Sequence, residues 1–414
     1  MTDNLEHKTV DHLFRHEYGK MVAILSKIFG LSNLELIEDA IQDTFLKASL
    51  KWRLKLPENP EAWLMKAAKN RVIDIFRQLN AEKKRQLKIS HGAISFDINE
   101  YFLDSEVQDS QLRMIFVACH PAFSQKEQIA FALKAISGFS IKEIASALLQ
   151  KEETIKKRLV RARKKIKDEN ISLNFPEQHD LSSRISGVLQ IIYLIFNEGF
   201  HSTKPNILIN KDLCGEAIRL CKLLLLKEKF RSGNLFALFS LLCFHASRID
   251  SKLVDNKIVD LESQDRSKWY LPLILLGNDA LNKSLEFNDR SIYHLEAAIA
   301  SEHVKAIEFK HTNWQRILAY YKEMYAMMPS DSILLSEAII YLKLNQLKKA
   351  KIVLDKINGE TLNQRRYLLN GCYAEYYKRS GDSMQAIIEL DFAIHSCANL
   401  FEKQYLTNKK SLLQ

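Results

Sequence analysis

The segment 152–166 carries cationic side chains that could bind a polyanion. At helical spacing, one face of this segment is cationic and the opposite face is apolar. The cationic positions are Lys156, Lys157, Arg161 and Lys164. The apolar positions are Ile155, Leu159, Ala162 and Ile166. Because lysine and arginine donate hydrogen bonds to phosphate oxygens and to base edges, this pattern predicts nucleic-acid binding.

The residues before this segment would position it. Ser140 can cap a helix that begins at Ile141, and Glu143, three residues after Ser140, completes a capping box. Ala145 is small, so a second helix can cross the first one closely after a short turn. We therefore predict a helix-turn-helix whose second helix enters the major groove of DNA, with a solvated basic helix of an ordinary bundle as the alternative. The predicted DNA contacts of the second helix are Thr154, Lys156, Lys157, Arg158, Arg161 and Lys164.

Another helix with polar chemistry on one face begins at Asn59-Pro60-Glu61. Asparagine caps a helix start, proline suits its first position and an acid suits its first turn. The face predicted to be buried carries Leu64, Ala68, Val72, Ile75 and Leu79. The opposite arc carries Trp63, Lys66, Asn70, Asp74 and Arg77. A flat aromatic ring among cations suits stacking on unpaired bases, and packing of Trp63 on a neighbouring helix is the alternative.

The composition of the chain argues against several other kinds of site. The 414 residues include six cysteines without a C-x-x-C pair, and the histidines form no H-x-x-x-H pair. No stretch reaches the roughly 20 apolar residues that would span a membrane, and the polar first residues are unlike a signal peptide. No phosphate-binding loop or nucleophile motif is present. We expect a cytoplasmic protein that is not an enzyme and holds no metal or cofactor.

Helical patterns run through the whole chain, and the formal net charge of +10 suits a polyanionic partner. Glycine and proline are scarce, at 12 and 7 residues, and convincing alternation of apolar and polar residues is missing. We therefore predict an all-α fold in four parts. These are a helical unit at 8–85, an acidic linker at 86–110, a smaller helical unit at 111–170 and a long helical extension at 180–414.

The extension contains an internal repeat in which six positions recur 36 residues later. The first copy has Ala338, Tyr341, Asn345, Ala350, Leu354 and Ile357, and the second has Ala374, Tyr377, Gly381, Ala386, Leu390 and Ala393. Small residues let paired helices approach closely, and aromatic and aliphatic residues fill the seam between them. The spacing resembles that of a tetratricopeptide repeat with a slightly long loop, and two unrelated amphipathic hairpins are the alternative.

Two motifs, in this order, resemble the DNA-binding regions of a known family. E-D-x-x-Q-D-x-F-L-K-A at 38–48, followed by P-x-x-W-L-x-x-x-x-x-N-x-x-x-D-x-x-R at 60–77, resembles region 2 of extracytoplasmic-function RNA polymerase sigma factors. G-x-S-x-x-E-I-A-x-x-L and T-I-x-x-R-L-x-R-A-R-x-x-I, within 138–166, are similar to their region 4. One departure is Glu153, because many relatives have a small residue before the threonine.

This resemblance implies a role for each motif. Region 2 would bind core RNA polymerase and capture the opened −10 element of promoter DNA, region 4 would read the −35 element, and the acidic linker would run toward the polymerase active site. The implied polymerase contacts are Asp39, Gln42, Asp43 and Phe45. The implied −10 contacts are Trp63, Lys66, Asn70, Arg71 and Arg77. None of this is enzyme chemistry, because catalysis belongs to the polymerase.

The extension resembles part of the same family. The segments 193–200, 264–269 and 293–300, and His120-Pro121-Ala122 before region 4, are similar to the subgroup with a C-terminal tetratricopeptide-like domain. We expect the extension to regulate the sigma module, with an unknown protein or small molecule acting on it. The candidate regulatory contacts are Asn197, Glu198, Asp265, Arg266 and Trp269.

Two other functions fit parts of the sequence. A one-component regulator would join a helix-turn-helix to a repeat-type sensor, but it has no need of a DNA-melting helix at 63–77. An enzyme in the extension would have to rely on Asn197, Glu198, Asp265 and Arg266. Pairing of these residues inside a helical scaffold is the simpler explanation.

Overall fold

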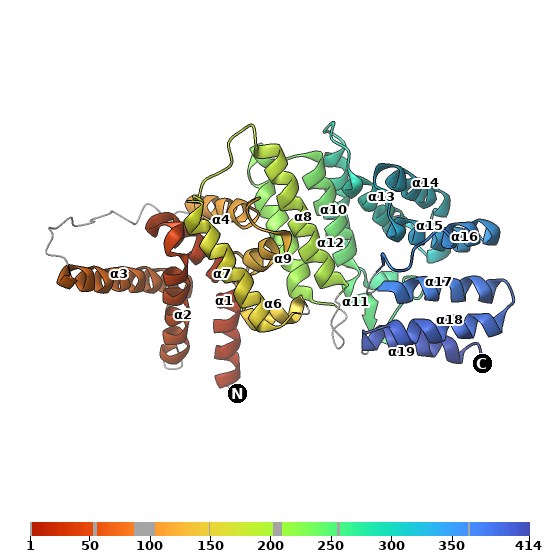
Figure 1. The fold of residues 1–414 in the computed structure, drawn as a ribbon, viewed down its shortest axis with the longest axis horizontal. Helices are drawn as coiled ribbons and strands as arrows, with labels where there is room; N and C mark the ends of the chain where they lie inside the picture. The colour runs from red at the N-terminus through yellow and green to blue at the C-terminus, as the bar shows by residue number, and fades with distance from the viewer. Residues whose placement is uncertain are drawn as a thin grey trace. The chain divides into compact units, whose positions relative to one another are not determined.

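The computed structural model describes residues 2–52, 56–86, 104–148, 150–201, 209–254, 257–362 and 365–414, so most of the predicted linker lies outside the described residues. The described residues are mostly helical, as predicted (Figure 1). The β structure of the described ranges is one antiparallel ladder between β1 (Leu253–Val254) and β2 (Lys257–Ile258). The chain divides into two compact units, Met1–Leu194 and Ile195–Gln414.

The first unit opens with helices that correspond to the unit predicted at 8–85. They are α1 (Thr2–Phe29), the short 3-10 helix η1 (Leu31–Asn33), α2 (Leu34–Lys51) and α3 (Pro60–Gln86). Gly30 ends α1 with a φ of 87°, a left-handed conformation that glycine adopts without strain. Asn59 caps α3 as predicted, because its Oδ1 accepts a hydrogen bond from the backbone N–H of Ala62 at 3.0 Å.

The buried face of α3 is shorter than the sequence predicts. Leu64, Ala68 and Val72 are buried. Ile75 is half-buried and Leu79 is 36% exposed, so the assignment of these two residues to the core was wrong. The apolar periodicity continues along the helix, but the C-terminal half of α3 extends beyond the helices that cover its first half (Figure 1). Periodicity predicts which face of a helix is apolar, but that face is buried only where another element packs against it.

The helix-turn-helix is part of a second group of helices in this unit. The group consists of α4 (Asp104–Ala118), α5 (Gln125–Ala135), α6 (Ile141–Ala147) and α7 (Glu152–Asp168). Helix α4 begins inside the predicted linker, so residues 104–110 are helical. Ser110 and Gln111 are buried near its middle, and α4 packs against α1.

The segment after α7 is anchored to α4. The guanidinium of Arg113 lies over the ring of Phe175, with Cζ 4.4 Å from the ring centroid, and Phe116 meets the same ring edge-on at 6.1 Å. Arg184, in the first half of α8 (Leu181–Phe200), donates from Nη2 to the carbonyl oxygen of Phe116 at 2.6 Å. The boundary between the two compact units falls inside α8, after Leu194, whereas the sequence predicts an extension that begins at 180.

The second unit is a succession of helices that pack on their neighbours in sequence. They are the remainder of α8, α9 (Lys211–Leu225), η3 (Glu228–Phe230), α10 (Gly233–Ser247), α11 (Ile249–Lys252), η4 (Arg266–Lys268), α12 (Leu271–Ser284), α13 (Ile292–Lys305), η5 (Phe309–His311), α14 (Trp314–Met327), α15 (Asp331–Lys343), α16 (Leu347–Leu354), α17 (Arg366–Arg379), α18 (Ser383–Ser396) and α19 (Leu400–Ser411). Helix α10 is apolar along most of its length because α9, α12 and α13 all pack against it.

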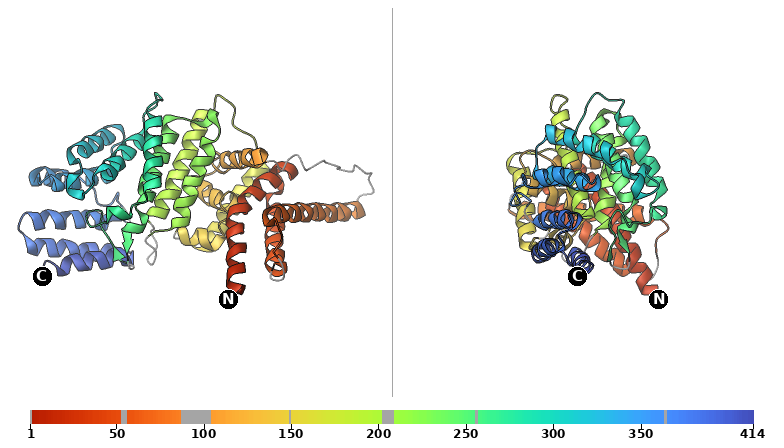
Figure 2. Two further views of the ribbon diagram at one scale, coloured as in Figure 1. Left: turned by 180° about the vertical axis from the view of Figure 1, so that it is seen from behind. Right: turned by 90° about the vertical axis from the view of Figure 1, so that its right-hand side faces the viewer.

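The predicted 36-residue repeat is confirmed as two helical hairpins, α15–α16 and α17–α18 (Figure 2). Asn345 and Gly381 occupy equivalent positions after the first helix of each hairpin, and both have a positive φ, 56° and 85°. The next backbone N–H reaches back to the equivalent tyrosine carbonyl at 2.9 Å in both hairpins, onto Tyr341 and Tyr377. This is the Schellman arrangement that ends a helix. The small residues and leucines of the seam are buried, namely Ala338, Ala350, Leu354, Ala374, Ala386, Leu390 and Ala393.

We predict opposite effects of alanine at two glycines of α17–α18. Gly381→Ala should destabilise the second hairpin by about 1 kcal/mol, because its φ of 85° is unfavourable for any residue with a Cβ. No atom lies within 4 Å of a Cβ built there, so sterics from neighbours add nothing. Gly371→Ala, inside α17, should stabilise by about 0.5–1 kcal/mol. Amide hydrogen exchange over 366–396 measures both, and equal signs would contradict the assigned C-cap.

Candidate nucleic-acid interface

Helix α7 has the two faces that the sequence predicts. Its buried residues are Ile155, Leu159, Ala162 and Ile166. Its exposed cations include Lys156, Lys157, Arg161 and Lys164. Helices α5 and α6 pack against the apolar face, and this packing turns the cations toward solvent. A helix held in this way can lie in a DNA groove with its cations near phosphates and base edges.

Helix α6 and the turn after it set the direction in which α7 is presented. The Oγ of Ser140 accepts from the N–H of Glu143 at 3.1 Å, and Glu143 Oε2 accepts from the N–H of Ser140 at 2.8 Å, so the predicted capping box is confirmed. Ala145 is 3% exposed, and its carbonyl accepts from the N–H of Gln150 at 2.8 Å. Arg158, a half-buried predicted DNA contact, donates from Nη2 to Gln150 Oε1 at 3.3 Å.

One exposed residue on the cationic face was missed. Val160 is 58% exposed and lies four residues from both Lys156 and Lys164. The helical spacing places it among the cations, but its apolar side chain carries none of the charge on which the prediction was based. An exposed valine on a recognition helix can contact the methyl group of thymine. Thr154, predicted to contact DNA, is half-buried in the first turn.

Two further cations of α7 face the protein, and their role was also missed. Lys165 donates from Nζ to Glu127 Oε2 at 2.9 Å and to the carbonyl oxygen of Ala122 at 2.8 Å. Burial alone would raise the pKa of Glu127, but hydrogen bonds from Lys165 and Ser124 lower it. Arg163 forms an ion pair with Glu38 of α2. These partners are far away in sequence, so local spacing could not find them.

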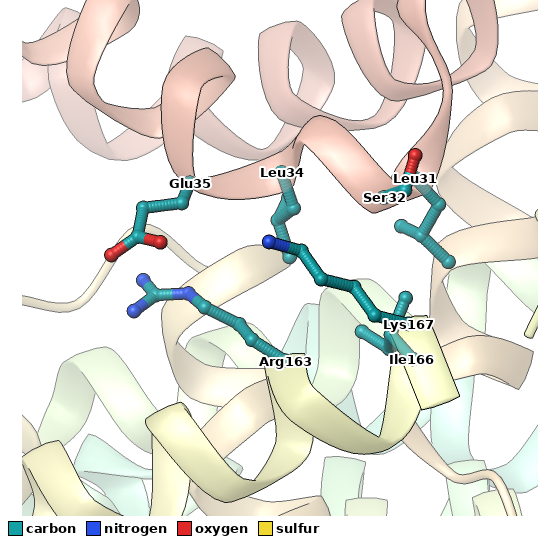
Figure 3. Close-up of a pocket in the computed structure, with 7 residues that line it drawn as sticks. All are labelled: Leu31, Ser32, Leu34, Glu35, Arg163, Ile166 and Lys167. Carbon is teal, nitrogen blue, oxygen red and sulfur yellow. The ribbon is translucent and has the colours of Figure 1, made fainter. Parts of the chain in front are cut away.

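The Arg163–Glu38 pair is the centre of a buried polar cluster that joins α7 to α1 and α2. Glu38 is 2% exposed, and the fully buried Tyr18 donates from Oη to Glu38 Oε1 at 3.3 Å. Burial and the Glu38 carboxylate raise the pKa of Tyr18, so the phenol stays a hydrogen-bond donor. The Nζ of Lys134 lies 4.9 Å from the centroid of the Tyr18 ring. Figure 3 shows the edge of the cluster, where the guanidinium of Arg163 points toward Glu35 across a small hollow.

Glycines allow the same helices to touch at the backbone. A Cβ at Gly19 of α1 would lie 1.8 Å from the carbonyl oxygen of Ile136, which follows α5. Gly138 has a φ of 69° and lies against the ring of Tyr18. The group α1–α3 and the group α4–α7 are therefore in direct contact within the first unit.

The residues of α2 predicted to bind a polymerase differ in exposure. Asp39 and Gln42 are exposed. Asp43 is half-buried because its Oδ2 accepts from Nε and Nη2 of Arg71 on α3, at 3.0 and 2.8 Å. Phe45 is 5% exposed and packs against α1. Its side chain therefore stabilises the packing of α2 and is not accessible to a partner in this structure. Asp43 and Arg71, predicted for two different interfaces, thus hold α2 and α3 together.

The polar arc of α3 is accessible along its length. Lys66, Asn70 and Arg77 are exposed. Trp63 is half-buried and meets the buried Trp52 edge-on, with ring centroids 5.4 Å apart. Part of the Trp63 ring packs on Trp52 and part faces solvent. This ring can therefore both stabilise the fold and stack on a base.

Family models match both helix groups. The model of Sigma-70 region 2 matches residues 13–82, within α1–α3, and the model of Sigma-70, region 4, matches residues 113–166, from α4 to α7. These two regions, in this order, indicate a sigma factor. Sigma factors bind core RNA polymerase and promoter DNA at transcription initiation, and they are not enzymes.

The rest of this sigma factor is similar to proteins without an assigned function. A family of unknown function, DUF6596, matches residues 184–285. An uncharacterized protein of Rhizobium meliloti (strain 1021), R00370, is 30% identical over 379 residues, which cover 90% of this chain and 89% of that protein. No solved structure matches the chain.

The candidate contacts of the extension lie in different surroundings. Asn197 and Glu198 are half-buried on α8. Asp265 is exposed and accepts hydrogen bonds from its own turn. Arg266 is half-buried and stacks on Trp269, which is 6% exposed, with its Cζ 4.8 Å from the ring centroid. Asp265 and Arg266 do not pair with each other, so they do not form the acid–base pair that an enzyme in the extension would need.

The described residues lack metal-binding clusters and membrane-spanning helices. They hold no cluster of three or more histidine, cysteine or acidic side chains that could bind a metal ion. All six cysteines are buried and unpaired, and burial raises the pKa of Cys119 to about 12. Within the same ranges no helix is long and apolar enough to span a membrane.

We predict that Arg163→Met loosens the contact between the two helix groups. It leaves the buried Glu38 carboxylate unpaired, a loss of about 3 kcal/mol, the low end for a broken buried pair because Arg163 keeps some contact with solvent. Amide exchange should increase over 134–139, which packs on Tyr18, and the double variant with Glu38→Gln should recover most of the protection. As a control, Lys165→Met should loosen α5 against α7 and leave α2 unchanged. Unaltered exchange in Arg163→Met would contradict the role of the pair.

Proposed function

We propose that this sigma factor is of the extracytoplasmic-function type, binds core RNA polymerase, recognises a −35 element through α7 and melts the −10 element through α3. The observation that carries the proposal is the geometry of α7, whose apolar face is buried while Lys156, Lys157 and Arg161 stay in solvent. It acts in the cytoplasm, where polymerase and chromosomal DNA are found.

Early residues of α7 read base edges and later ones contact phosphates. Lys157 and Arg161, one helical turn apart, suit the acceptor edges of guanine, and Val160 between them suits a thymine methyl group. Lys164 near the end suits a phosphate. In this assignment Thr154 and Arg158 position the turn as much as they contact DNA, since both are half-buried.

Helix α3 receives the opened strand on the arc that carries Trp63, Lys66 and Asn70, with Arg77 contacting phosphate farther along. Arg71 acts indirectly, because its guanidinium is already bound to Asp43 and so orients α3 on α2. The exposed Asp39 and Gln42 are the polymerase contacts of α2.

Promoter binding requires the two helix groups to separate. Elements at −10 and −35 are about 25 base pairs apart, which is roughly 85 Å of DNA at about 3.4 Å per base pair. In the free protein the two groups touch at Gly19 and Gly138 and share the Arg163–Glu38 pair. We infer that the contact opens when core polymerase or promoter DNA binds.

The extension regulates the sigma module in cis. Arg184, near the start of the extension, donates to the carbonyl oxygen of Phe116 on α4, a helix that precedes the helix-turn-helix, and this contact supports the role. A tetratricopeptide-like surface would bind an unknown protein or small molecule.

The alternative of a one-component regulator differs in one respect: a sigma factor supports run-off transcription with purified core polymerase, and a one-component regulator does not.

Substitutions on α7 should distinguish base contacts from phosphate contacts. Arg161→Ala or Lys157→Ala should weaken promoter binding by about 1–3 kcal/mol if the side chain reads a base edge. A phosphate contact would instead lower the slope of log affinity against log salt by about one. Binding to a promoter mapped by run-off transcription, measured at several salt concentrations, decides between these results. Lys126→Ala, an exposed cation on α5, is the control, and a loss equal to that of Arg161→Ala would contradict the assignment.

Removal of residues 176–414 tests control by the extension. We expect core affinity or promoter output to change by about tenfold, which corresponds to roughly 1.4 kcal/mol of coupling. Because the truncation also removes Arg184 from Phe116, Arg184→Gln in the full chain is the matched control. A truncated protein with the core affinity, transcription output and stability of the full chain would show that the extension has another role.

A further inference from the structure

Cations and histidines gather in the second unit where α8, α10, α11, η4 and α13 meet. The cations are Arg248, Lys252 and Arg266, and the histidines are His201, His245 and His303. The three cations are half-buried, so solvent reaches them while much of each side chain is enclosed. We call these six residues the cationic cluster.

Lys252 and Arg248 converge on the end of α8. Lys252 donates from Nζ to the carbonyl oxygen of Phe200 at 2.7 Å, and this Nζ lies 4.1 Å from the centroid of the Phe200 ring. The Cζ of Arg248 lies 5.2 Å from the same centroid, and its Nη2 lies 3.4 Å from Nδ1 of His245. Nδ1 of His201 lies 3.4 Å from Nζ of Lys252. The partners of these two cations are thus aromatic rings, neutral nitrogens and a carbonyl.

Arg266 and its neighbours leave donors without acceptors. One nitrogen of Arg266, Nη1, donates to the carbonyl oxygens of His303 and Ala306, the latter at 2.6 Å. The other, Nη2, is buried without a hydrogen-bond partner. Nε1 of Trp269 and Nδ1 of His303 are buried without a partner as well. Buried donors of this kind are costly unless a water or an ion satisfies them.

The positive charge of the cluster is only partly offset by the described residues, because the carboxylate of Glu402 acts on Lys252 from beyond ion-pair distance. No carboxylate among the described residues lies within ion-pair distance of Arg248, Lys252 or Arg266. Burial, and then the charge of Arg248, lower the pKa of Lys252 to about 7. Burial, and then Arg266, lower the pKa of Arg248 to about 10, and burial with both arginines lowers that of His303 to about 3. Like charges are held together here at a cost that an anion would remove.

We propose that the cationic cluster binds a small, multiply charged oxyanion of the phosphate class. Three cations and the unpartnered donors Arg266 Nη2 and Trp269 Nε1 match a group with two negative charges and several acceptor oxygens better than a single carboxylate. Arginine and lysine do not ligate metal ions in the way that carboxylates and thiolates do, so a metal fits poorly. This site goes beyond the sigma function, and its occupancy does not depend on whether the extension regulates transcription.

Equilibrium dialysis of the full chain against labelled inorganic phosphate tests the proposal, with ionic strength held constant by chloride. We expect one phosphate per chain at this site, competition by sulfate and none by acetate. Arg248→Gln and Lys252→Gln should each weaken binding at least tenfold. The recognition-helix variant Lys157→Gln/Arg161→Gln is the matched control, since it removes two exposed cations and should leave this site unchanged. A phosphate monoester such as glycerol phosphate, run in parallel, distinguishes an organic phosphate from the free ion as the preferred ligand.

The stability of the variants separates a binding site from a structural cation. Without phosphate, Arg248→Gln should melt at the same temperature as the unsubstituted chain or higher, because it removes an unbalanced charge. Phosphate should slow amide exchange over 245–252 and 264–269 in the unsubstituted chain, a test that needs no variant. The proposal is overturned if phosphate leaves this exchange unchanged, as ordered water at the orphaned donors would predict. It is also overturned if phosphate binding is lost only in the recognition-helix variant.

Discussion

The ion pair between Arg163 and Glu38 is the interaction on which the arrangement of the DNA-binding parts depends. A carboxylate that is 2% exposed is stable only with a cation and further hydrogen bonds around it, and Arg163 and Tyr18 supply them. Burial alone would lower the pKa of Arg163, but the Glu38 carboxylate raises it, so the guanidinium stays charged. Because Arg163 lies on the inner side of α7, the pair fixes which side of that helix faces out. The solvent exposure of Lys157 and Arg161 follows from this contact and from the apolar stripe.

An ion pair is also a contact that can be opened at modest cost. When two apolar surfaces separate, their exposure to water costs free energy and nothing offsets that cost. When a carboxylate and a guanidinium separate, each regains its hydration, which offsets much of the lost attraction. The net stabilisation from a buried pair is therefore small compared with the penalty for removing one partner alone. If region 2 and region 4 part to span a promoter, as we propose, this asymmetry lowers the cost of opening the Arg163–Glu38 pair.

The sequence predicts well the features that depend on neighbours in the chain, and poorly those that depend on distant ones. The two faces of α7 and the capping box at Ser140 follow from local spacing, and the structure confirms them. Leu79 has the right spacing for a core residue but lacks a helix to cover it. Glu38 lies 125 residues from Arg163, so no local pattern could indicate their pairing. The predicted roles of individual residues in polymerase and promoter contacts stay predictions, because they depend on molecules outside the chain.

Exposure to solvent distinguishes the cations on the outer face of α7 from those of the cationic cluster. Exposed lysines on α7 are hydrated, so their lack of a carboxylate partner costs little and by itself requires no ligand. Arg163 is buried and has its carboxylate, so it is satisfied. Arg248 and Lys252 are enclosed without one among the described residues, and this combination is unfavourable in a free protein. Folding alone does not favour such a cluster, since neutral side chains of similar size would pack there at lower cost. Its presence is most simply explained by a further negative charge beyond those of the described residues.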